Sequence, residues 1–168
     1  MRNSKALYIT KAAIIAALYV VLTMLTGAFG SAAGPIQIRI SEALTILPFF
    51  MPEAVPGLFI GCLLGNIFTG CLPWDIVFGS IATLIGAIGT YYIGKANLPD
   101  KYKKWLAPLP PIISNTLIIP YILIKVYHID GVYPYFMLTI GLSEILSAGI
   151  LGMIFLFSLK RYINRRLH

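Results

Sequence analysis

The chain has 168 residues, of which 58% are hydrophobic and only 11% are charged, and its mean hydropathy is +0.85. About 25% of the residues in a typical soluble domain are charged, and a chain this short leaves much of its surface exposed, so a water-soluble globular fold is excluded. The net charge of +7 comes from clusters of Lys and Arg that flank apolar runs, as in membrane proteins, which argues against a nucleic-acid-binding surface.

We therefore expect an all-α integral membrane protein with a single transmembrane domain over residues 1–168. A spanning helix needs about 20 apolar residues, and the first apolar run exceeds the roughly 7–15 residues of a secretory signal core. The apolar runs predict helices at approximately 7–29, 41–49, 52–69, 75–94, 110–126 and 134–160.

The stretch over residues 40–69 is irregular because prolines, among them Pro48 and Pro52, interrupt it. The positive-inside rule places both termini and the basic loop 96–104 in the cytoplasm. Under that rule, this stretch begins and ends outside, and it crosses the membrane either twice or not at all. We favour two short helices, which gives a six-helix bundle with both termini cytoplasmic. Four spans with a re-entrant loop are the alternative.

Small residues recur at four-residue spacing, which lets helix backbones approach closely in lipid. The series Gly57, Gly61 and Gly65 is best explained by packing inside one bundle. The alanines of the first helix either pack in the same way or form an outward face that docks on another membrane protein. These alanines are Ala12, Ala13, Ala16 and Ala17.

Glu144 is the strongest single candidate for a functional side chain. It lies about ten residues, or roughly 15 Å, into the last predicted helix, with Ser143 and Ser147 close to it on the same helix. A carboxylate at that depth needs a partner or a function. We expect a ligand or coupling role, and the alternative is a buried pair with another residue such as Arg39.

The other candidates lie at predicted helix starts or inside predicted helices. Each can be explained structurally, as a helix cap, an interfacial tryptophan or an interhelical hydrogen bond. Each can also be explained functionally, by contact with a solute. An aromatic ring beside a carboxylate would suit a flat nitrogenous ring. These candidate substrate-binding residues are Arg39, Glu42, Asn66, Trp74, Asp75 and Asn115.

Nothing in the sequence indicates catalysis. The stretch 89–95 has the spacing G-x-x-x-x-G-K, but Ala96 follows where a phosphate-binding loop has Ser or Thr. We find neither a nucleophile–base pair nor a set of metal ligands at suitable spacing. We expect no cofactor, no metal and no ATPase activity in this chain.

Several segments resemble the QueT family. They lie at 39–45, 47–50, 52–54, 56–59, 75–84 and 106–111, and the likeness extends over roughly residues 12–152. QueT proteins are substrate-binding S components of energy-coupling factor (ECF) transporters for queuosine precursors. The resemblance implies six membrane helices in a bacterial plasma membrane and a solute site toward the outer face. It also implies that the loop near Gly30–Arg39 closes this site.

The resemblance also implies partners and a solute. The first helix, through its four alanines, would dock on a transmembrane coupling protein, and two separate cytoplasmic ATPases would supply the energy. The expected solutes are 7-deazaguanine bases such as preQ1 and preQ0, or queuine. An S component for another vitamin-like solute and a non-catalytic membrane assembly protein are the alternatives.

Overall fold

The computed structural model describes residues 4–28 and 38–166, and within these residues every regular element is a helix. Four of the helical stretches are long and apolar enough to cross a membrane, and two apolar helices are shorter. The expected all-α membrane class is therefore confirmed. The elements are α1 (Ser4–Ala28), the 3₁₀ helix η1 (Ile40–Phe49), α2 (Ala54–Phe68), α3 (Pro73–Lys95), α4 (Asp100–Leu106), α5 (Leu109–Lys125), α6 (Tyr133–Glu144), the π-helix η2 (Ile145–Leu151) and α7 (Gly152–Arg166).

The helices begin where the sequence favours a helix start. α3, α5 and α6 each carry a proline in the first turn, where the missing N–H costs nothing and the fixed φ suits the helix. Between α2 and α3 the chain reverses at Gly70, whose φ of +73° lies in the left-handed region. Glycine adopts this conformation without a steric penalty.

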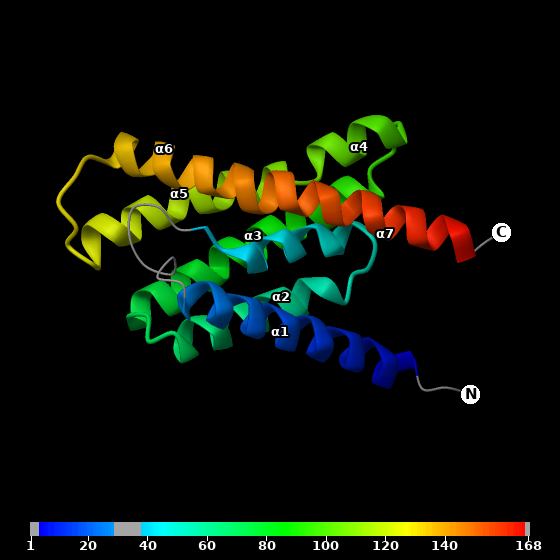
Figure 1. Ribbon diagram of the computed structural model, residues 1–168, viewed down its shortest axis with the longest axis horizontal. Coiled ribbons are helices and arrows are strands. Elements are labelled where there is room, and N and C mark those ends of the chain that lie inside the picture. The colour runs from blue at the N-terminus through cyan, green and yellow to red at the C-terminus, as the bar shows by residue number, and fades with distance from the viewer. Residues whose placement is uncertain (1–3, 29–37, 167–168) are drawn as a thin grey trace.

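The helices run roughly along the long axis of the molecule, and both chain ends lie at the same end of the bundle (Figure 1). The short helix α4 lies at this end too. The turn between α5 and α6 lies at the opposite end. α6, η2 and α7 follow one another as a single long helix, which closes the bundle beside η1.

The stretch 40–69 forms two short helices, η1 and α2, rather than one long one. A 3₁₀ helix rises about 2.0 Å per residue against about 1.5 Å in an α-helix. Ten residues of η1 therefore extend over roughly 20 Å, less than the roughly 30 Å of a hydrocarbon core. Eight of its residues are buried, so η1 lies inside the bundle, where neighbouring helices shield its backbone.

α1 and α2 pack closely because glycine faces α1 along one side of α2. A Cβ on Gly57 would lie 2.7 Å from the carbonyl oxygen of Ala12, and one on Gly61 would lie 2.7 Å from Cβ of Tyr19. Neither contact is sterically possible. The glycine spacing therefore serves packing within the bundle, as the sequence indicated.

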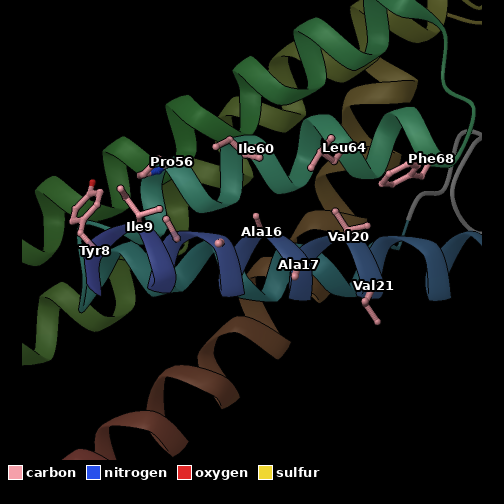
Figure 2. Close-up of a pocket in the computed structure, with 12 residues that line it drawn as sticks. Tyr8, Ile9, Ala16, Ala17, Val20, Val21, Pro56, Ile60, Leu64 and Phe68 are labelled. Atoms are coloured by element: carbon pink, nitrogen blue, oxygen red, sulfur yellow. The ribbon is translucent and has the colours of Figure 1, made fainter. Parts of the chain in front are cut away.

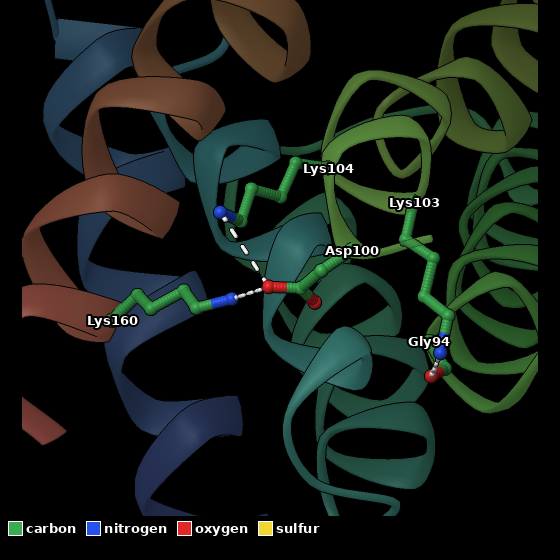
Figure 3. Close-up of polar contacts among 5 residues, drawn as sticks. All are labelled: Gly94, Asp100, Lys103, Lys104 and Lys160. Atoms are coloured by element: carbon green, nitrogen blue, oxygen red, sulfur yellow. Dashed lines mark hydrogen bonds and ion pairs between the residues drawn. The ribbon is translucent and has the colours of Figure 1, made fainter. Parts of the chain in front are cut away.

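A cluster of charges ties α4 to the rest of the bundle at the end that holds the termini (Figure 3). Asp100 accepts from Lys160 of α7 and lies 3.6 Å from Lys104, while Lys103 donates to the Gly94 carbonyl at 3.3 Å. Residues 96–104 were expected to form a loop, but Asp100–Leu106 form the helix α4. The helix is too short and too polar to give a periodic apolar signal.

Candidate functional site

Five polar side chains from distant parts of the sequence lie buried together inside the bundle. All are at most 8% exposed, and each was a candidate from sequence. Two of them come from η1 and its N-cap residue, one from α2 and one from α5. The fifth is the last residue of α6. They are Arg39, Glu42, Asn66, Asn115 and Glu144.

Asn115 bridges the two glutamates. Its Nδ2 donates to Oε1 of Glu144 at 3.0 Å and lies 3.4 Å from Oε2 of Glu42. The hydroxyl of Tyr19 on α1 donates to the other oxygen of Glu42. Both oxygens of Glu42 are therefore engaged, while Oε2 of Glu144 is buried without a partner in residues 4–28 and 38–166.

Arg39 is held from the opposite side of the cluster by an amide. Its Nη1 donates to Oδ1 of Asn66 at 3.2 Å. Nδ2 of Asn66 contacts the sulfur of Cys62 at 3.6 Å, and Thr83 donates to the same sulfur at 3.3 Å. Nε of Arg39 is buried and has no hydrogen-bond partner in the part of the chain that the structure describes.

The buried guanidinium and the buried carboxylates do not pair directly. In residues 4–28 and 38–166, the ion pairs within 4 Å join Lys11 to Glu53 and Asp100 to two lysines. The alternative that Glu144 pairs with Arg39 therefore fails. Arg39 and the two glutamates instead line one cavity, and their hydrogen bonds go to the amides of Asn66 and Asn115 and to the Tyr19 hydroxyl.

One cavity connects the two halves of the cluster. Its volume is about 10 Å³, which is room for about one water molecule. A bicyclic base would enter only if the surrounding side chains moved apart. The lining residues are Arg39, Glu42, Gly79, Thr83, Asn115, Ile119, Ile140 and Glu144.

Three further candidates, Asp75, Ser143 and Trp74, lie outside this cavity. Asp75 is buried and accepts from the Tyr127 hydroxyl at 2.8 Å. Burial and the Asp75 carboxylate raise the pKa of Tyr127, so its hydroxyl remains a donor at neutral pH. Ser143 donates to the Thr139 carbonyl of its own helix at 3.0 Å.

Trp74 is not brought into the cluster. It is 61% exposed and stacks on Phe78 with ring centroids 6.0 Å apart. Helix geometry separates it from Asp75, because neighbouring residues on a helix point about 100° apart. The expected pairing of an aromatic platform with a carboxylate is therefore absent here.

Sequence reasoning missed Tyr19 and Thr83, and it missed the change in helix type after Glu144. Tyr19 is fully buried, and with Thr23 and Thr26 it forms a polar stripe on the buried face of α1. That spacing was the available signal. The π-helix η2 begins directly after Glu144, and π segments are frequent at functional sites.

The four alanines of α1 divide between two environments. Ala12 and Ala16 are buried, whereas Ala13 and Ala17 are exposed. All four line a groove of about 620 Å³ between α1 and α2, where Ile60 and Leu64 lie alongside Ala16 and Val20 (Figure 2). The groove is almost entirely apolar, as expected of a surface covered by lipid or by another membrane helix.

The expected closing loop near Gly30–Arg39 lies mostly outside the described residues. Only Ile38 and Arg39 of it are described. Arg39 belongs to the cluster itself, since its guanidinium lines the cavity.

Apolar helices around a buried set of opposite charges and amides define a multi-pass membrane protein of the transporter class. Comparison with known families agrees. Residues 9–161 match the family model described as "QueT transporter", and the chain belongs to this family. The family resemblance in the sequence is thereby confirmed.

A curated relative supports the same assignment. Over 86 residues the chain is 40% identical to the "Queuosine precursor transporter QueT" of Lactococcus lactis subsp. cremoris (strain MG1363). The match covers 51% of this chain and 50% of the relative, so it spans about half of the relative's length. No solved structure matches the chain.

Proposed function

We propose that this chain is the solute-binding subunit of an ATP-driven ECF-type importer and that its solute is a queuosine precursor. The solute is a 7-deazaguanine base such as preQ1 or preQ0, or queuine. One observation carries this proposal: a donor of Arg39 and an acceptor of Glu144 are both buried without a partner among the described residues, and both residues line the same cavity. The name of the Lactococcus relative supports the solute.

The chemistry of a 7-deazaguanine base fits this set of side chains. The ring carbonyl accepts hydrogen bonds, for which Arg39 and the Asn115 amide are suitable donors. The ring N–H and the exocyclic amine donate, and a carboxylate can accept such a pair with charge assistance. Ile119 and Ile140 supply apolar contact to the flat ring.

Binding to the purified full chain tests this function. Queuine and the two 7-deazaguanine bases are titrated into protein in lipid nanodiscs, with riboflavin, thiamine and biotin as competitors. Binding of a deazaguanine with no competition from the vitamins is the expected result. Competition by one vitamin alone would favour an S component for that solute, and absence of any binding would favour an assembly protein.

The orientation in the membrane follows from the charges. Lys160 and two lysines of α4, Lys103 and Lys104, lie together (Figure 3), and α4 lies at the end that holds both termini (Figure 1). Basic residues favour the cytoplasm. Both termini are then cytoplasmic, the whole chain is a single transmembrane domain of six crossings, and the turn at Gly70 faces outward. Labelling of Asn97→Cys and Gly70→Cys in a chain whose two cysteines are replaced tests this, because only the second is expected to react from outside.

The energising partners dock on α1. The groove between α1 and α2 offers small side chains at Ala13 and Ala17, which allow close approach of a partner helix. The partner is a transmembrane coupling protein that carries two cytoplasmic ATPases. Ala17→Trp is expected to abolish co-purification with the partner subunits, whereas Leu138→Trp, on the exposed face of α6, leaves it unchanged.

A further inference from the structure

We infer that the cavity selects a solute that carries a positive charge, and that Glu144 is the residue that recognises this charge. This inference rests on the proposed function and narrows its substrate class to deazaguanines with an alkylammonium group. The carrying observations are two acidic side chains against one cationic side chain in the lining of the cavity, and the oxygen of one glutamate that has no partner among the described residues.

The residues that line the cavity include one cationic side chain, Arg39, and two acidic ones, Glu42 and Glu144. One guanidinium balances one of the two carboxylates, so the second glutamate either keeps a proton or faces a cation, because an unbalanced buried charge is costly inside a membrane protein. A solute with one positive charge allows both glutamates to ionise, and a neutral solute does not.

The hydrogen bonds indicate which glutamate is available. Glu42 is fixed through both oxygens by Tyr19 and Asn115. Among the described residues, Glu144 has a partner for Oε1, and its Oε2 is buried without one. Asn115 therefore orients Glu144 so that one oxygen remains for the solute.

The free donor of the cavity lies on Arg39, whose Nε has no partner while its Nη1 is held by Asn66. A solute that satisfies both free atoms has an acceptor for the Arg39 donor and a cation for Glu144. A deazaguanine with an aminomethyl group has both, since its ring bears a carbonyl and its substituent an ammonium. The cyano analogue has the carbonyl but no cation.

Isothermal titration of the full chain in nanodiscs with 7-aminomethyl-7-deazaguanine and 7-cyano-7-deazaguanine tests the inference. We expect the aminomethyl base to bind at least about tenfold more tightly to the unaltered chain. Glu144→Gln keeps the shape of the side chain and removes its charge. It is expected to weaken binding of the aminomethyl base about 30-fold or more and to change that of the cyano base less than about threefold.

Glu53→Gln is the matched control, because Glu53 pairs with Lys11 outside the cavity, and it should leave both affinities unchanged. Equal affinity of the unaltered chain for the two bases overturns the inference while leaving the proposed function intact. If Glu144→Gln loses the same affinity for both bases while its thermal unfolding midpoint is unchanged, the role of Glu144 is overturned. If neither base nor queuine binds the unaltered chain, the proposed function itself fails.

Discussion

Asn115 donates to Glu144 across the interface between α5 and α6, at 3.0 Å, from two helices that were predicted separately. The same nitrogen reaches Glu42 on η1. One amide therefore joins three elements and sets the direction of both carboxylates. Its removal affects the packing of the bundle and the shape of the cavity together.

Asn115→Ala is expected to lower both the stability and the solute affinity of the chain. Each glutamate would lose a donor, and an unsatisfied buried acceptor costs about 1–3 kcal/mol. Thermal unfolding in nanodiscs and solute titration measure the two effects. Asn97→Ala, at an exposed position after α3, is the control and should change neither quantity. An unaltered midpoint for Asn115→Ala would contradict the bridge.

Tyr19→Phe tests the second restraint on Glu42. The ring continues to fill its place, and only the donor to Glu42 is lost. We expect a loss of about 1–3 kcal/mol in stability and a weaker solute affinity, because Glu42 becomes free to turn. Tyr92→Phe is the matched control, since Tyr92 is 66% exposed on α3. Equal behaviour of the two variants would argue against the Tyr19–Glu42 hydrogen bond.

Gly61→Ala is expected to destabilise the contact between α1 and α2. The added Cβ would lie 2.7 Å from Cβ of Tyr19, and such overpacking typically costs about 1–3 kcal/mol. Gly141→Ala is the control, because its Cβ would lie at an ordinary 3.5 Å from Thr116. The unfolding midpoint should fall only for Gly61→Ala. A fall of similar size in both variants would mean that close packing at Gly61 is not the cause.

The Lys11–Glu53 pair predicts a pH-dependent contribution to stability. A hydrogen bond from its own backbone N–H and the Lys11 ammonium hold the pKa of Glu53 below its ordinary value of 4.5. A lowered folded-state pKa means that the contribution is present above pH 4.5 and is lost as the pH falls through the lowered value. The pair is partly exposed, so its contribution is at most about 1 kcal/mol.

Glu53→Gln is therefore expected to lower the unfolding midpoint slightly at pH 7, with an effect that disappears as the pH falls through the lowered pKa of Glu53. Melting curves of both chains across this range measure the difference. Lys11→Met should show the same dependence, since it removes the other partner. A difference that persists unchanged in acid would contradict the ionic origin of the contribution.

The positions of the helices could be predicted from the sequence, but the contacts between helices could not. Apolar runs and prolines marked α3 and α5 to within a few residues, because lipid requires long apolar helices whatever their packing. The polar groups of the cavity were also visible, since Arg39, Glu42 and Glu144 are conspicuous in apolar sequence.

What the sequence did not contain was the contact between those groups. Spacing along one helix gives no information about which face meets another helix, so Trp74 was grouped with Asp75 although the two side chains diverge. Tyr19 was not among the candidates. Its spacing with Thr23 and Thr26 marks a polar face of α1, but that face does not indicate that Glu42 is its partner.

The π-helix η2 that follows Glu144 affects how members of this family should be aligned. An i→i+5 turn holds more residues than an ordinary helical turn, so η2 shifts the angular position of everything beyond it. A family member that kept an uninterrupted α-helix here would need a gap in its alignment to this chain, placed between Glu144 and Gly152. Without that gap, residues facing lipid in one protein would be equated with residues facing the interior in the other.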